Sequence, residues 1–143
     1  MKAFIDSDIL IWHLRGEPKA LTLLKRLRDH EGFELWTGAM QRAEVVFFMR
    51  PAEKEATVLF LSQFQTAAVD QWIIDKAGEF YRKWNPGNGT DVNDAILAAT
   101  AMKTGGKICT LNTKHYPMSE VVVQQAWKVP KKAAHPQPVT PEP

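Results

Sequence analysis

The sequence predicts an α/β fold of three layers, in which helices cover both faces of a central parallel sheet. Two observations predict it. Short apolar runs of strand length alternate along the chain with longer segments whose apolar residues recur at helical spacing. In the first run, Ala3-Phe4-Ile5, apolar residues do not alternate with polar ones, as is typical of a strand buried on both faces. The length of 143 residues fits one domain with its own core.

The N-terminal segment is expected to hold two strands and two helices. The first strand ends at Asp6, and Ile9 to Leu14 is apolar enough for a short helix or turn packed under it. Pro18 suits the first turn of a helix that runs to about His30, with leucines along one face. Phe33 to Trp36 is the second candidate strand.

The middle of the chain predicts three helices. Two of them, separated by a proline, are expected over Ala39 to Met49 and over Ala52 to Phe64. Ala67 to Val69 is a weak strand candidate, and Asp70 can cap the next helix, which reaches Trp84. The proline, glycines and asparagines of residues 85–90 predict a loop.

The last part of the chain predicts one more helix and two more strands. The alanine-rich helix covers Val92 to Thr104 and stops at a glycine pair, and the strands cover Lys107 to Leu111 and Val121 to Val123. We expect residues 1–128 to form the folded domain. Residues 129–143 contain lysines and five prolines with few apolar residues, so we expect them to form a disordered tail.

Charge and cysteine content exclude several classes of protein. The net charge is +2, and the part of the chain before Lys128 has equal numbers of acidic and basic residues, so no strongly basic surface indicates a nucleic-acid binder. Cys109 is the only cysteine, which excludes a disulfide framework and a cysteine-based metal site. No apolar run approaches the roughly 20 residues that cross a membrane. Without a signal peptide before the first strand, we expect a cytoplasmic protein.

Three carboxylates lie where secondary structure could direct them to one site. Asp6 ends the first strand, Glu44 lies in an otherwise apolar helical stretch, and Asp94 opens the alanine-rich helix. Ligands of open parallel sheets bind outside the carboxyl ends of the strands, where Asp6 is expected. Further polar residues at the same edge are Asp8, Asp91 and Asn112, the last of which follows a predicted strand.

Each acid also has a purely structural interpretation. Asp91 and Asp94 have the spacing of a capping box, and Asp8 could cap the helix or turn after the first strand. Glu44 could be an exposed helix residue or an ion-pair partner of Arg42 or Arg50. Taken one at a time, the acids leave these alternatives open.

Taken together, the acids favour a metal site. Carboxylates packed close together repel one another, and a fold tolerates them best when cations lie between them. Oxygen-only ligands prefer hard ions such as Mg²⁺ or Mn²⁺. Such ions activate water and stabilise the oxygens of a phosphoryl displacement, so hydrolysis of phosphodiester bonds is the chemistry that this set of residues favours.

Four motifs resemble those of the PIN-domain family, and within it the VapC-type toxins of bacterial and archaeal toxin–antitoxin pairs. They are Phe-Ile-Asp-Ser-Asp-Ile-Leu-Ile from Phe4, Ala-Glu-Val around Glu44, Asn-Asp-Ala-Ile-Leu-Ala-Ala-Thr-Ala around Asp94, and Thr-Leu-Asn-Thr-Lys-His-Tyr-Pro from Thr110. They occur in the family's order and span most of the predicted domain.

The resemblance implies roles for particular residues. Asp6, Glu44 and Asp94 would be catalytic and would bind the metal, and Ser7 would support them by hydrogen bonding. A fourth acid of many PIN domains falls at Asn112, which brings no charge. Asp91 and Asp8 are our own candidates to compensate for it, chosen for their expected place at the same edge and not for a match to the family. Three further residues could contact RNA phosphates because of their place near the predicted edge: Arg15, Lys114 and His115. The alternative for each is a plain surface or packing residue.

The resemblance also implies an activity and partners. It implies a Mg²⁺- or Mn²⁺-dependent endoribonuclease, a cognate antitoxin protein that holds it in check, and a homodimer. One alternative is a PIN-fold RNA- or partner-binding module without catalysis, for which the only support is Asn112. The other is a phosphatase of the haloacid dehalogenase type, suggested by Asp6 and Asp8 after a strand but disfavoured by Leu10, where those enzymes expect threonine or valine.

Overall fold

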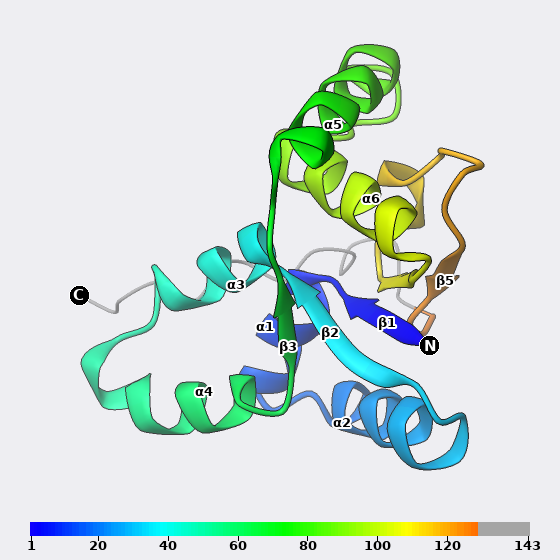
Figure 1. The fold of residues 1–143 in the computed structure, drawn as a ribbon. Coiled ribbons are helices and arrows are strands. Elements are labelled where there is room, and N and C mark those ends of the chain that lie inside the picture. The colour runs from blue at the N-terminus through cyan, green and yellow to red at the C-terminus, as the bar shows by residue number, and fades with distance from the viewer. Residues whose placement is uncertain (129–143) are drawn as a thin grey trace.

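In the computed structural model, which describes residues 1–128, five parallel strands form one sheet in the order β3-β2-β1-β4-β5 (Figure 1). The neighbouring strands of β1 are β2 and β4, and Ala3 is in register with Leu35 on one side and Lys107 on the other. The strands are β1 (Lys2–Ile5), β2 (Glu34–Gly38), β3 (Gln65–Ala67), β4 (Lys107–Thr110) and β5 (Val123–Gln125).

Helices cover both faces of this sheet, which confirms the predicted three-layer α/β/α class. Figure 1 shows α5 and α6 on one side of the strands and α2 on the other. The helices are α1 (Ser7–Leu14), α2 (Pro18–Lys25) with its wider last turn η1 (Arg26–His30), α3 (Ala39–Val46), η2 (Pro51–Glu53), α4 (Lys54–Leu61), α5 (Gln71–Trp84), α6 (Val92–Thr104) and η3 (Thr113–His115).

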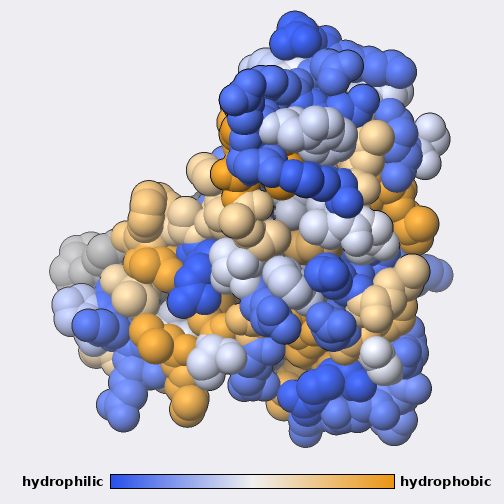
Figure 2. Space-filling model, in the orientation of Figure 1, coloured by the Kyte–Doolittle hydropathy of each residue, from blue (hydrophilic) through white to orange (hydrophobic). Residues whose placement is uncertain are grey.

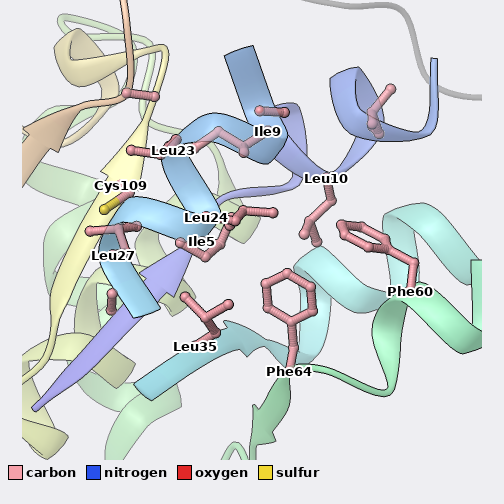
Figure 3. Close-up of a cluster of buried hydrophobic side chains, with 14 of the residues drawn as sticks. Ile5, Ile9, Leu10, Leu23, Leu24, Leu27, Leu35, Phe60, Phe64 and Cys109 are labelled. Atoms are coloured by element: carbon pink, nitrogen blue, oxygen red, sulfur yellow. The ribbon is translucent and has the colours of Figure 1, made fainter. Parts of the chain in front are cut away.

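Two apolar clusters, one on each face of the sheet, form the core. Ile5 points into the cluster built with α1, α2 and α4, where Leu10, Leu24 and Phe60 meet (Figure 3). Phe4 points into the other cluster, against α5 and α6. Because neighbouring strand residues face opposite sides, the run Ala3-Phe4-Ile5 has to be apolar throughout, as the sequence indicated.

The alanines of α6 explain how that helix lies against its neighbours. Residues 94–101 are all buried, since α6 is covered by α5, the sheet and the segment after β4. The helix ends at Gly105, which adopts a left-handed backbone conformation with φ 77°. This packing directs the first turn of α6, with Asp94, to the carboxyl edge of the sheet.

Several element boundaries differ from the sequence-based predictions. The helix α1 begins at Ser7 and not at Ile9, because the Asp6 side chain accepts a hydrogen bond from the Ser7 backbone N–H and so caps it. The strand β3 covers Gln65–Ala67 and β5 covers Val123–Gln125, each displaced by two residues from its predicted position. Both are short edge strands, for which the pairing partner decides the boundary: Ala67 pairs with Gly38, and Val123 with Ile108.

Two helices also end three residues before their predicted last residues, Met49 and Phe64. The helix α3 stops at Val46, and α4 is preceded by the short turn η2 that starts at Pro51. The predicted tail, residues 129–143, lies outside the described residues. Within residues 1–128, no helix is long and apolar enough to span a membrane.

Candidate active site

A cavity of about 110 Å³ opens at the carboxyl edge of β1 and β4, beside the first turns of α1 and α6. Its lining consists almost entirely of residues that the sequence analysis singled out: Asp6, Ser7, Asp8, Glu44, Asp91, Asp94, Asn112 and His115. The structure thus brings together acids that are up to 88 positions apart in the chain. Parallel strands produce this convergence because their carboxyl ends meet at one edge.

The Asp6 side chain is buried and held by three hydrogen bonds. The backbone N–H of Ser7 donates to Oδ1 at 2.8 Å, and the hydroxyls of Thr110 and Tyr116 donate to Oδ2 at 2.9 and 2.8 Å. Burial raises the pKa of the Asp6 carboxyl above its ordinary value, while these hydrogen bonds lower it. Burial also raises the pKa of Tyr116 well above its ordinary range, so that its hydroxyl remains a neutral donor.

The Asp8 carboxylate joins α1 to the end of β4. Its Oδ2 accepts from the backbone N–H of Leu111 at 3.0 Å and lies 3.2 Å from the Thr110 hydroxyl, while Oδ1 accepts from the Ile9 backbone N–H at 2.7 Å. The cap of α1 is Asp6, so the expectation that Asp8 caps this helix is wrong. Burial, followed by the charge of Asp6, raises the pKa of Asp8 well above its ordinary value.

Asp91 and Asp94 form the capping box that their spacing predicted. Asp91 Oδ1 accepts from the backbone N–H of Asp94 at 2.7 Å, and Asp94 Oδ2 accepts from the backbone N–H of Asp91 at 3.0 Å. Asp94 nevertheless also faces the cavity: its Oδ1 lies 3.1 Å from the Tyr116 hydroxyl, and its Oδ2 lies 3.1 Å from His115 Nδ1. Burial and the charge of Asp6 raise the pKa of Asp94 to about 8. Capping and facing the site are therefore compatible in one residue.

Glu44 extends from α3 into the same cavity, where it contacts Ser7 and Asn93. The Ser7 hydroxyl donates to Glu44 Oε2, and the Asn93 side-chain amide donates to Oε1 at 2.7 Å. Burial raises the pKa of the Glu44 carboxyl. The interpretation of Glu44 as an exposed surface residue is therefore wrong.

The three residues predicted to contact RNA lie in different places relative to the cavity. His115 lines the cavity, and Lys114 is its exposed neighbour in η3. Arg15 follows the last residue of α1, the helix whose first residue is at the site, and it is not part of the cavity lining. Arg15 is exposed and lies at the opposite end of α1 from Ser7.

Sequence reasoning missed three residues that hold the acids: Thr110, Tyr116 and Asn93. Thr110 ends β4 at the same edge as Asp6 ends β1, and this position was the signal that could have identified it. Asn93 precedes Asp94 in the first turn of α6. Tyr116 belongs to the last of the four motifs, but nothing in that motif indicated that its hydroxyl bonds to a residue 110 positions away.

The donor set fits a hard divalent cation. Carboxylate oxygens dominate the cavity, and burial raises the pKa of Asp6, Glu44 and Asp94, as expected where a positive charge is needed to keep them ionised. In residues 1–128 no three acid, histidine or cysteine side chains are already arranged to hold an ion. Binding would therefore require at least one of these side chains to move toward the others.

Fold and site together define a class: a parallel three-layer α/β protein with a carboxylate-lined cavity at the carboxyl edge of its central strands. The particular family follows from its sequence pattern. The PIN domain pattern matches residues 3–121, and the chain belongs to this family, as the four motifs indicated.

Two curated relatives agree with this membership. The chain is 33% identical over 115 residues to Ribonuclease VapC19 of Mycobacterium tuberculosis, covering 80% of this chain and 91% of the relative. It is 32% identical over 117 residues to Ribonuclease VapC10 of the same organism, covering 81% and 86%.

Solved structures share the fold at lower identity. One is a toxin–antitoxin complex from Klebsiella pneumoniae, with a TM-score of 0.70 and 21% identity, covering 90% of this chain and 100% of that chain. Another is VapBC2 from Rickettsia felis bound to a DNA fragment from its promoter, with a TM-score of 0.72 and 14% identity, covering 87% and 98%.

Proposed function

We propose that this protein is a Mg²⁺- or Mn²⁺-dependent endoribonuclease, the toxin of a type II toxin–antitoxin system, which hydrolyses phosphodiester bonds of RNA in the cytoplasm. The observation that carries the proposal is the convergence of Asp6, Glu44 and Asp94 on one cavity at the carboxyl edge of the sheet. The two relatives of about one-third identity, both named ribonucleases, support it.

In the proposed mechanism, Asp6, Glu44 and Asp94 hold the metal. When bound, a divalent ion lowers the pKa of a coordinated water and offsets charge on phosphate oxygens. The protein's own contribution is orientation: Ser7 and Asn93 each donate to one oxygen of Glu44, so neither oxygen can turn away without losing a hydrogen bond. Lys114 and His115, at the rim of the site, would contact RNA phosphates.

Asn112 and Asp91 would complete the site. Asn112 lines the cavity in the position where many relatives place a fourth acid, and its side chain can orient a water but adds no charge. Asp91 brings a carboxylate to the same cavity from the start of α6. We assign Asp91 as the auxiliary acid, since both oxygens of Asp8 already accept backbone hydrogen bonds, Oδ1 from Ile9 within α1 and Oδ2 from Leu111 after β4.

The decisive experiment is cleavage of total cellular RNA by the purified full chain with Mg²⁺, Mn²⁺ or EDTA. Asp6→Asn and Asp94→Asn are the test variants, and Asp75→Asn, an exposed acid on α5, is the matched control. Fragments that require metal, persist in Asp75→Asn and vanish in both test variants support the proposal. Cleavage that persists in both test variants contradicts the assigned site.

Inactivity would favour a different function. Metal binding by wild type without RNA cleavage, once copurified antitoxin is excluded, would favour a binding module, the function that Asn112 supports. Release of phosphate from a small monoester would favour a phosphatase.

The proposed antitoxin has a candidate surface on this chain. Large apolar side chains are exposed over the segment from α3 to α4, namely Phe47 at 79%, Leu59 at 69% and Val58 at 44%, and Figure 2 shows hydrophobic residues gathered there. Exposed apolar patches of this kind mark protein interfaces. The surface adjoins the site because α3 also contains Glu44.

Coexpression with the antitoxin tests this surface. We expect Leu59→Asp to lose copurification while its RNA cleavage persists, whereas Leu21→Asp, at an exposed leucine of α2, retains the complex. If the antitoxin copurifies equally with both variants, it binds a different surface of the protein. The resemblance also supports a homodimer, which the molar mass in solution tests.

A further inference from the structure

Tyr116 extends from the apolar core to two of the acids that line the cavity. It follows η3, between β4 and β5, and is 4% exposed. Its ring belongs to the apolar cluster that contains Phe4 and Ile108. Only its hydroxyl meets polar groups, and these are two of the acids that we assign to the metal.

One hydroxyl thus links two elements of the fold. It donates to Asp6 Oδ2 at 2.8 Å and lies 3.1 Å from Asp94 Oδ1. Asp6 is at the end of β1, and Asp94 is in the first turn of α6. Because the ring is fixed by the core, the hydroxyl sets the spacing between the two carboxylates.

The same hydrogen bond decides which oxygen of Asp6 remains available. An ionised carboxylate has about two acceptor positions on each oxygen. Both positions of Oδ2 are used, by the Thr110 and Tyr116 hydroxyls. Among the described contacts, Oδ1 accepts only from the Ser7 backbone N–H and keeps an acceptor position.

We propose that Tyr116 is a positioning residue of the metal site. Its hydroxyl holds Asp6 Oδ2 and separates Asp6 from Asp94, which leaves Asp6 Oδ1 as the oxygen that binds a divalent cation. The proposal rests on the metal-dependent function proposed above. It adds a residue that does not itself contact the ion or the RNA.

The two tyrosines of the chain provide a matched experiment. Tyr116→Phe removes the hydroxyl and keeps the ring in the core. Tyr81→Phe removes the same atom from an exposed side chain of α5 that is 37% accessible. Mn²⁺ affinity is measured by calorimetry on the full chain, and RNA cleavage is measured as a function of Mn²⁺ concentration.

We expect Tyr116→Phe to bind Mn²⁺ about 10- to 100-fold more weakly than wild type, the usual effect of losing a residue that orients a metal ligand. The Mn²⁺ concentration needed for half-maximal cleavage should rise by the same factor, and Tyr81→Phe should match wild type. A Tyr116→Phe protein that folds and binds Mn²⁺ as wild type does overturns the proposal. If wild type itself binds no Mn²⁺ and cleaves no RNA, the result contradicts the proposed metal-dependent function, and with it the role of Tyr116 that rests on that function.

A second measurement does not depend on the folding of Tyr116→Phe. Because the chain has two tyrosines, the Tyr81→Phe protein contains Tyr116 as its only one. We label the tyrosine ring of this protein with carbon-13 and record its NMR spectrum. The Tyr116 resonance should shift on Mg²⁺ binding and broaden strongly with paramagnetic Mn²⁺. A signal that neither ion changes, in a protein that binds both, also overturns the proposal.

Discussion

The Ser7 hydroxyl donates a hydrogen bond to Glu44 Oε2, across 37 positions of the chain. This contact joins the first residue of α1 to α3. It orients one of the two carboxylate oxygens of Glu44, an acid that we assign to the metal. The acids of this site are therefore held by neighbouring donors as well as by the backbone. Four predictions test what this arrangement implies.

Ser7→Ala should weaken metal binding and RNA cleavage by about 10- to 100-fold, because Glu44 keeps only its bond from Asn93 and can rotate. Mn²⁺ calorimetry and kcat/KM on a defined RNA measure the effect. Ser62→Ala is the control, since this exposed serine bonds to the backbone oxygen of Leu59. Equal affinities in both variants would show that the Ser7 hydroxyl does not orient Glu44.

Metal affinity should rise with pH. In the metal-free protein the pKa of Asp94 is raised to about 8, mainly by burial, and the pKa values of Asp6 and Glu44 are raised as well. An ion must displace the protons bound to these carboxyls, so binding should tighten up to about pH 8 and release protons. Calorimetry in buffers of different ionisation enthalpy measures that release. An affinity independent of pH below 8 would contradict the raised pKa of Asp94.

Asp94→Asn should stabilise the metal-free protein at alkaline pH. A carboxyl whose pKa is higher in the folded than in the unfolded state favours folding when protonated, and this contribution is lost as the pH rises through about 8. Asparagine avoids that loss and can still accept the hydrogen bond from Asp91. We expect the free energy of unfolding at pH 9 to rise by about 1–3 kcal/mol. At pH 4 the gain should disappear, which urea titrations at both pH values would reveal.

Asn112→Asp should tighten divalent metal binding by about tenfold, because it adds a carboxylate to the cavity lining. Its metal-free form should be less stable at neutral pH, owing to the additional like charge. Gln71→Glu adds the same charge at the exposed start of α5 and is the control. If Asn112→Asp leaves Mn²⁺ affinity unchanged, Asn112 is not placed to contribute to the ion.

Much of the fold was predictable from the sequence because its signals are local. The run Ala3-Phe4-Ile5 indicated a strand buried on both faces, and the structure places Phe4 and Ile5 in opposite clusters. The spacing of Asp91 and Asp94 predicted their capping box. The short edge strands β3 and β5 were misplaced by two residues, because pairing with a neighbour decides where such strands begin.

By itself, the sequence determined the parallel α/β class and the acids that lie at the carboxyl edge of the sheet. Only the tertiary structure decided which donors hold them: Tyr116 and Thr110 reach Asp6 across 110 and 104 positions. Strand and helix patterns arise from interactions between residues near in sequence. The hydrogen-bond partners of a buried carboxylate depend on how distant elements pack, so the motif that contains Thr110 and Tyr116 did not indicate that both bond to Asp6.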